Sequence, residues 1–240
     1  MPKAVFDLVR QDLEARIVDG TYPYGSLLPS ESMLVSTYGY SRNTIRRALS
    51  VLADEGYVQP MNGRGVRVLW QPVAGRAQGT MVGLESFEEY ARHNGFVPST
   101  KVKVFEHVTC DQTIAARTGH LVGDDLIHVV RVRYFDDTPR QIDHNYFLAS
   151  AIPGLTPEIC ASSVYGYVEQ ELGMRIVTSK RSMTVELADE EDRTIMDMGS
   201  YNCVAVLRSQ SFNSEGVMFE HTRTHSHPDA FCFMDTARRA

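Results

Sequence analysis

A short amphipathic segment over residues 41–52 constrains this chain more than any other feature. Its apolar residues recur at helical spacing, namely Ile45, Ala48, Leu49 and Leu52. This spacing predicts one helix with a buried apolar stripe. Ser41 stands just before the first turn, where its hydroxyl can accept a hydrogen bond from a free backbone N–H, so the helix is expected to begin after Ser41.

The exposed face of this predicted helix is cationic. It carries Arg42, Asn43, Thr44, Arg46 and Arg47, with no carboxylate before Asp54. A guanidinium group offers forked donors to phosphate oxygens and to the guanine edge, and an α-helix fits the DNA major groove. The alternative is a solvated helix face that happens to be basic. The predicted elements before and after this helix help to decide between DNA binding and a solvated basic face.

Two helices are expected before this one. The first spans residues 3–19, and the second begins at Ser30 and ends near Gly39. Only Gly39 and Tyr40 separate the second helix from Ser41, which is the spacing of a helix-turn-helix. The cationic helix is the second of that pair, the position of a recognition helix.

A β-hairpin is predicted after the cationic helix. Two short β runs flank the turn Asn62-Gly63-Arg64-Gly65, so Arg64 lies at the hairpin tip between two glycines. A small basic finger of this kind can enter the minor groove. A helix-turn-helix followed by a basic hairpin makes a winged helix, and it favours DNA binding through residues Ser41, Arg42, Asn43, Thr44, Arg46, Arg47 and Arg64.

The distribution of charge agrees with one localised cationic surface. The 240-residue chain has a formal net charge of −6, yet five arginines stand against two acidic residues between positions 41 and 67. A protein with this balance is not expected to coat nucleic acid indiscriminately. The sequence has no apolar run of about 18 residues, no signal peptide and no CxxC, so we expect no membrane segment and a cytoplasmic protein with reduced thiols.

The rest of the chain predicts a second domain. Pro72, Gly75 and Gly79 mark residues 71–80 as a linker between a winged-helix domain over 1–70 and a domain over 81–240. Hairpins with interspersed helices indicate an α+β domain around an antiparallel sheet. Among its expected elements are a hairpin across Asp136-Asp137, helices over 163–172 and 189–198, and a strand over 231–234 that closes the sheet.

Arg131 and Arg133 are the best candidates for a ligand site in this domain. They are two residues apart on a predicted strand, so both project from one face and can clamp a phosphate or carboxylate. The alternative is the polar outer face of a sheet. Asp143, on the partner strand, can accept from a sugar hydroxyl or pair with an arginine. Ser163 and Ser86 each open a helix, where each is an anion ligand or only an N-cap.

The histidines and the catalytic motifs point to no enzyme and no metal centre. His221 and His225 share a strand face but lie roughly 13 Å apart at about 3.3 Å per residue, too far to hold one ion. The nearer pair His225 and His227 lacks a third ligand. No GxSxG, HExxH, Walker A or GxGxxG motif is present. We therefore predict no catalytic residue, no metal and no cofactor.

The first seventy residues resemble the winged-helix domain of GntR-family bacterial transcription regulators. The resemblance rests on Leu28-Pro29-Ser30-Glu31, Ser41 to Leu49, Gly56-Tyr57-Val58 and Gly63-Arg64-Gly65. The remainder looks like the effector-sensing UTRA domain of the histidine-utilisation-repressor branch, whose fold is similar to chorismate lyase. That second likeness rests on Arg131-Val132-Arg133, residues 139–143, Ser163-Val164-Tyr165 and Phe219-Glu220. Within the branch the likeness is greatest to trehalose operon repressors, through residues 85–89 and 180–186.

The resemblance implies a role for each candidate effector residue. Ser86, Phe87, Arg131, Arg133, Ser163 and Tyr165 would hold a phosphate group, and Asp143 and Glu220 would hold sugar hydroxyls. The branch usually has Glu at the position of Asp143. We therefore expect a homodimeric repressor that binds operator DNA and responds to a small phosphorylated sugar, with trehalose 6-phosphate as the leading effector. The alternatives are the same architecture sensing an amino-sugar phosphate, urocanate or another carboxylate, or a lyase-type enzyme.

Overall fold

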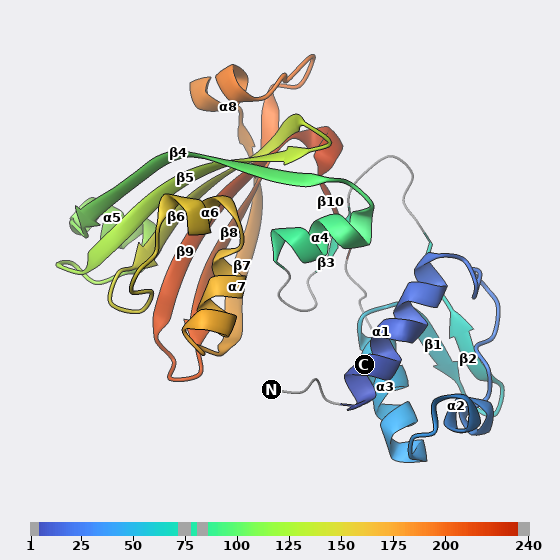
Figure 1. Cartoon of the computed structure of the whole chain (residues 1–240). Coiled ribbons are helices and arrows are strands. Elements are labelled where there is room, and N and C mark those ends of the chain that lie inside the picture. The colour runs from blue at the N-terminus through green and yellow to red at the C-terminus, as the bar shows by residue number, and fades with distance from the viewer. Residues whose placement is uncertain (1–4, 72–77, 81–85, 235–240) are drawn as a thin grey trace. The chain divides into compact units, whose positions relative to one another are not determined.

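The computed structural model describes residues 5–71, 78–80 and 86–234, and the chain divides into two compact units (Figure 1). One unit comprises residues 1–83 with 233–240, and the other comprises residues 84–232. The predicted start of the second domain at Met81 and residues 72–77 of the predicted linker lie outside the described residues. Within the predicted linker, Gln78–Thr80 form the short strand β3.

The first unit is a three-helix winged-helix fold. Its elements are α1 (Val5–Val18), α2 (Glu31–Tyr38), α3 (Arg42–Asp54), β1 (Val58–Met61) and β2 (Gly65–Val68). The apolar stripe of α3 is buried against α1 and α2, with Ile45 and Leu52 fully excluded from solvent. Strands β1 and β2 pair antiparallel, with Val58 opposite Val68. The predicted helix-turn-helix and hairpin are confirmed.

The ends of the helix-turn-helix follow from residues that satisfy free backbone groups. The hydroxyls of Ser30 and Ser41 cap α2 and α3 by accepting from the backbone N–H groups of Met33 and Thr44. Gly39 ends α2 in the left-handed conformation with φ +70°, which a glycine adopts without steric cost. Helix α3 therefore begins at the residue that the sequence predicts.

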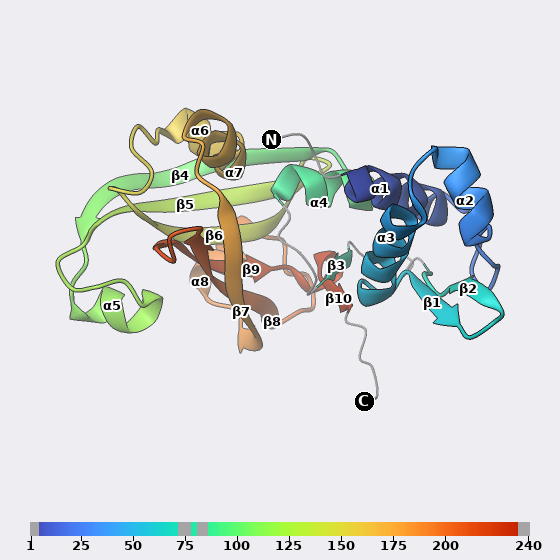
Figure 2. The same cartoon turned by 90° about the horizontal axis from the view of Figure 1, so that it is seen from below.

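The second unit is built on one antiparallel sheet of six strands in the order β4-β5-β6-β9-β8-β7 (Figures 1 and 2). The strands are β4 (Pro98–Thr109), β5 (Asp125–Phe135), β6 (Thr138–Leu148), β7 (Ile176–Leu187), β8 (Cys203–Asn213) and β9 (Met218–Ser226). Asp136 and Asp137 join β5 to β6 with φ values of 48° and 64°. Asp tolerates this conformation better than most side chains, so the predicted turn is confirmed.

Each face of the sheet has its own covering elements. Helices α6 (Pro157–Ala161) and α7 (Val164–Gly166), with the π-helical turn Tyr167–Glu171, lie together over one face, where their apolar side chains share a core cluster with β5 (Figures 1 and 2). Helix α8 (Glu190–Ile195) begins a segment that packs on the other face through Met196 and Met198. Helices α4 (Phe87–Asn94) and α5 (Gln112–Thr118) complete the unit.

Three details differ from the sequence-based expectation. Strand β10 (Cys232–Met234) does not close the six-stranded sheet but pairs with β3, because a three-residue strand carries no local information about its partner. The helix expected over 163–172 divides into α7 and the π-helical turn, and the helix expected to reach Met198 ends at Ile195. Within the described parts of the chain, no helix combines the length and apolar character needed to span a membrane.

Candidate functional site

Arg131 and Arg133 are buried side by side on the face of the sheet that α6 and α7 cover. Only 4% of Arg131 and 7% of Arg133 are exposed, so the alternative of a polar outer face is wrong. The strand pairing places Asp143 and Asn145 of β6 and Glu220, Thr222 and Thr224 of β9 on the same face. We call this surface the arginine face. Buried charges require partners, and each charged group here has one.

Arg133 is held on three sides. Its Nε donates to Oδ2 of Asp143 over 2.8 Å, and Nη1 donates to the Thr100 hydroxyl over 2.8 Å. The guanidinium carbon also lies 4.7 Å from the ring centroid of Phe87 on α4. Thr224 donates to the other oxygen of Asp143 over 2.7 Å. Asp143 is thus an arginine partner in this structure.

Arg131 connects the arginine pair to a second group of polar side chains. Its Nη2 lies 3.6 Å from Oδ2 of Asp143, and its Nε donates to the Asn145 side-chain oxygen over 3.0 Å. The Asn145 side-chain nitrogen donates to Glu220 over 3.1 Å and to the Thr222 hydroxyl over 2.7 Å. One continuous network therefore links two cations with two carboxylates across three strands.

Tyr165 joins the network from α7. Its hydroxyl donates to Oε2 of Glu220 over 2.9 Å and lies 2.9 Å from the hydroxyl of Ser211. Ser163 caps α7, accepting from the Gly166 N–H over 3.1 Å. Ser86 caps α4 within a capping box whose other member is Glu89. Both serines therefore have the N-cap role that the sequence left open, and this role does not exclude contact with a ligand.

The electrostatics of the arginine face favour an ionised Arg133 beside an ionised Asp143. Burial, and then the charge of Arg131, lowers the pKa of Arg133 to about 10, so the guanidinium remains charged at neutral pH. Burial opposes ionisation of Asp143, but the charges of Arg133 and Arg131 hold its pKa below the usual range. Burial, and then the charge of Glu220, raises the pKa of Tyr165 well above its ordinary value, so the phenol stays a donor.

A pocket of about 720 Å³ opens next to this network. Ser86, Ser163 and Tyr165 line it, together with residues of α4 and of the π-helical turn, among them Arg92 and Glu169. Its volume lies within the range of roughly 300–1,000 Å³ that small-molecule sites occupy. Tyr165 lines the pocket and also donates to Glu220 of the buried network, so it connects the pocket to the charged residues of the arginine face.

The structure brings the eight predicted effector residues into one region. Phe87, Arg131, Arg133, Asp143, Tyr165 and Glu220 belong to the connected network, and Ser86 and Ser163 line the pocket with Tyr165. The sequence reading missed Thr100, Asn145, Ser211, Thr222 and Thr224. The period-2 alternation that placed Arg131 and Arg133 on one face could have found Asn145, because it lies two residues after Asp143.

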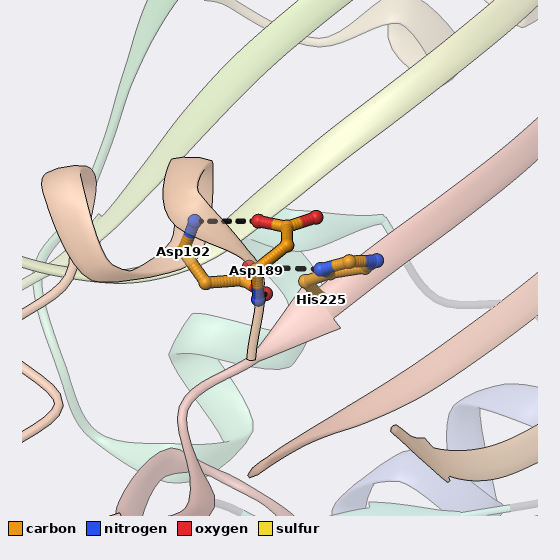
Figure 3. A group of neighbouring side chains, drawn as sticks. All are labelled: Asp189, Asp192 and His225. Atoms are coloured by element: carbon orange, nitrogen blue, oxygen red, sulfur yellow. Dashed lines mark hydrogen bonds and ion pairs between the residues drawn. The ribbon is translucent and has the colours of Figure 1, made fainter. Parts of the chain in front are cut away.

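Asp189, Asp192 and His225 form a cluster on the opposite face of the sheet (Figure 3). His225, 2% exposed, lies with Nδ1 2.8 Å from Oδ1 of the fully buried Asp192. Asp189 and Asp192 accept from each other's backbone N–H groups in a capping box. These bonds already engage an oxygen of each carboxylate and the histidine nitrogen nearest to them. The cluster therefore fastens the start of α8 to β9.

The predicted DNA-binding residues lie on the outer surface of the winged helix. Arg42, Asn43, Arg46 and Arg47 are exposed along α3, and Arg64 is exposed in the turn between β1 and β2. Thr44 is half-buried, and its hydroxyl lies 2.9 Å from that of Ser41. The remaining face of α3 is the buried stripe, so the cationic side of the helix faces solvent.

Two of these arginines have partners within the winged helix. Arg46 Nε lies 2.9 and 3.0 Å from the two carboxylate oxygens of Glu31 on α2. The guanidinium carbon of Arg47 lies 4.1 Å from the ring centroid of Phe6 on α1. Glu31 and Phe6 thus orient Arg46 and Arg47 at the surface, a role that the sequence reading did not assign to either residue.

Comparison with known proteins identifies both units. Residues 7–68 match the gntR family of bacterial regulatory proteins, and residues 93–232 match the UTRA domain. The chain is 34% identical over 234 residues to the HTH-type transcriptional regulator TreR of Bacillus subtilis strain 168, covering 98% of this chain and 97% of that protein.

Solved structures agree with this assignment. The possible transcriptional regulator YydK of Bacillus subtilis matches at a TM-score of 0.79 and 20% identity, covering 98% of this chain and all of that chain, which shows the fold. The effector-binding domain of the Bacillus subtilis trehalose repressor matches at a TM-score of 0.53 and 32% identity, over 59% of this chain and 99% of that domain. This chain belongs to the GntR family of bacterial transcription regulators, with a UTRA effector domain following its helix-turn-helix domain.

Proposed function

We propose that this protein is a homodimeric cytoplasmic repressor whose operator binding is controlled by a phosphorylated sugar, with trehalose 6-phosphate as the lead, that binds the arginine face. The observation that carries the effector proposal is the buried pair Arg131 and Arg133 beside the pocket that Tyr165 lines. The likeness to a protein named a trehalose repressor supports the choice of sugar.

The DNA-binding half of the proposal rests on the exposed cationic side of α3 and on the hairpin tip. Arg42, Asn43 and Thr44 stand at the N-terminal end of α3, the end of a recognition helix that contacts base edges. Ser41, Arg46 and Arg47 would contact the DNA beside them, and Arg64 would enter the minor groove. Two copies would present two such helices to a roughly palindromic operator.

The effector half follows from the donors that the network leaves available. Arg133 uses Nε and one Nη1 hydrogen inside the protein, and Arg131 uses Nε, so terminal N–H groups of both guanidiniums remain to bind a dianionic phosphate. Ser86 and Ser163 line the pocket, and Phe87, next to Ser86 at the start of α4, would also contact the phosphate. Asp143 and Glu220 supply acceptors for sugar hydroxyls.

A thermal-shift panel with the full-length protein tests the effector. We expect trehalose 6-phosphate to raise the melting temperature, and the same compound to change the affinity for a DNA duplex that the protein has selected from a random library. Trehalose, glucosamine 6-phosphate, inorganic phosphate and urocanate are the comparison ligands. A larger shift with glucosamine 6-phosphate or with urocanate would replace trehalose 6-phosphate by an amino-sugar phosphate or a carboxylate. No shift with any anion would refute the effector proposal.

A further inference from the structure

We propose that Asn145 is the positioning residue that ties the anion-binding Arg131 to the hydroxyl-accepting Glu220. This inference rests on the proposed function of the arginine face and assigns a part in it to a residue that the ligand need not touch. Asn145 lies on β6, the strand between those that carry Arg131 and Glu220. From this central strand, the Asn145 side chain can reach both Arg131 and Glu220.

Asn145 is fully buried, and both ends of its amide are engaged. Its oxygen accepts from Arg131 Nε over 3.0 Å, while its nitrogen donates to Glu220 over 3.1 Å and to the Thr222 hydroxyl over 2.7 Å. A guanidinium has only donors and an ionised carboxylate has only acceptors. The neighbours therefore set which end of the amide faces which group, and the Asn145 side chain has one orientation that satisfies both.

This arrangement determines how the two functional groups meet a ligand. With Nε bound to Asn145 and Nη2 3.6 Å from Oδ2 of Asp143, Arg131 keeps terminal N–H groups available for the anion that it would share with Arg133. Glu220 receives three donors, from Asn145, Thr222 and Tyr165, which hold its carboxylate in one rotamer. A ligand hydroxyl then meets an acceptor that is already oriented, so less conformational entropy is lost on binding.

The chemistry of the amide makes the residue type testable. Asn145→Asp keeps the acceptor for Arg131, removes the donor to Glu220, and places a second carboxylate beside it. Asn145→Leu has a similar size and removes both functions. Neither an ionised carboxylate nor an apolar side chain can accept from a cation and donate to a carboxylate at once. The two variants therefore separate the contribution of each end of the amide.

The experiment measures binding of trehalose 6-phosphate and inorganic phosphate by calorimetry, together with the Arg131 Nε–H signal by NMR, in full-length protein. Asn145→Leu should weaken trehalose 6-phosphate binding at least tenfold and expose the Nε–H to rapid exchange with water. Asn145→Asp should keep the Nε–H protected, yet weaken binding of both probes, with recovery relative to wild type as the pH falls from 7 to 5 and the new carboxyl is protonated.

The matched control is Gln210→Leu, which removes a side-chain amide from the opposite face of the sheet, where its nitrogen donates to the Thr118 carbonyl. This variant should bind both probes as wild type does. Wild-type affinity and a protected Nε–H in Asn145→Leu would overturn the inference. If Asn145→Leu does not fold, Thr222→Val, which removes the hydroxyl between Asn145 and Glu220, should weaken sugar-phosphate binding, and unchanged binding would overturn it.

Failure of the proposed function would look different. A wild-type protein that binds neither probe would refute the sugar-phosphate proposal, whereas the Arg131 Nε–H signal in Asn145→Leu and Asn145→Asp still decides whether Asn145 positions Arg131. If Asn145 were purely structural, both variants would have a lower melting temperature, but the dissociation constant of the folded protein would be unchanged. The Arg131 Nε–H would then be protected in both variants.

Discussion

Arg133 donates Nε–H to Oδ2 of Asp143 over 2.8 Å, and both side chains are buried on the arginine face. Without ligand, the carboxylate of Asp143 supplies the negative charge that two adjacent guanidiniums require. A buried pair of this kind contributes little net stability compared with apolar residues, but removing one partner leaves an uncompensated charge. We therefore expect the protein to lose more stability when one member of the pair is replaced than when Arg133 and Asp143 are replaced together by uncharged residues.

Arg133→Met should lower the free energy of unfolding by about 3 kcal/mol, the typical cost of removing one partner of a buried ion pair, because Arg131 alone would then balance the carboxylates of Asp143 and Glu220. Adding Asp143→Asn should recover part of that loss, because the uncompensated carboxylate is gone. Urea denaturation of the two variants and wild type measures the difference. A double variant no more stable than Arg133→Met would contradict the pairing, and neither variant should respond to sugar phosphate.

Arg42→Ala should weaken operator binding roughly 10- to 100-fold while leaving the fold intact, since a good base or phosphate contact contributes about 1–3 kcal/mol. Fluorescence anisotropy with the selected duplex at several salt concentrations measures the effect. Arg117→Ala, an exposed arginine on α5 of the other unit, is the control and should bind as wild type does. Equal binding by Arg42→Ala would remove this residue from the interface.

Ser41 offers a way to separate helix capping from DNA contact. Ser41→Ala should destabilise the winged helix by about 1 kcal/mol, because the Thr44 N–H loses its acceptor. Ser41→Asp keeps an acceptor and should retain stability, yet it places a negative charge at the cationic surface and should weaken operator binding more than Ser41→Ala. Thermal unfolding measures the change in stability, and fluorescence anisotropy measures the change in operator affinity. The reverse order of affinities would count against Ser41 lying near phosphate.

The environment of His221 makes the stability of the folded protein depend on pH below neutrality. It is buried on the face opposite the arginine face, and its Nδ1 has no hydrogen-bond partner in the described part of the chain. Burial, then the nearby His120 and Arg208, lowers the pKa of His221 from 6.5 to about 4. Between these values the unfolded chain binds a proton that the folded protein does not, so stability falls as the pH decreases from about 6.5 to about 4.

His221→Gln should remove this component of the acid sensitivity. The variant's free energy of unfolding relative to wild type should improve steadily between pH 6.5 and pH 4 in urea titrations. At pH 8 the imidazole is neutral in both states, so the comparison there isolates the packing cost of the substitution. Parallel pH profiles for the two proteins would show that His221 is not kept neutral by the fold.

The winged helix could be predicted almost completely from the sequence, because its signals are local. The apolar stripe of α3, the caps at Ser30 and Ser41, and the glycine that ends α2 each depend on residues a few positions apart. The same holds for the turn at Asp136 and for the shared face of Arg131 and Arg133, which follows from the two-residue period of a strand. The resemblance to a known family supplied Glu220, which local pattern alone would not have selected.

Tertiary structure decided which of those local elements pack against each other and which strands pair. Periodicity placed Arg131 and Arg133 on one face, but only the packing of α6 and α7 made that face buried. Asn145 meets Glu220 from 75 residues away, and β10 pairs with β3 instead of the large sheet. Such pairings depend on which strands become neighbours, and a strand's own residues specify its alternation without naming its partner. The sequence by itself determined the helix-turn-helix and the candidate ligands, and the fold decided which of them form a connected site.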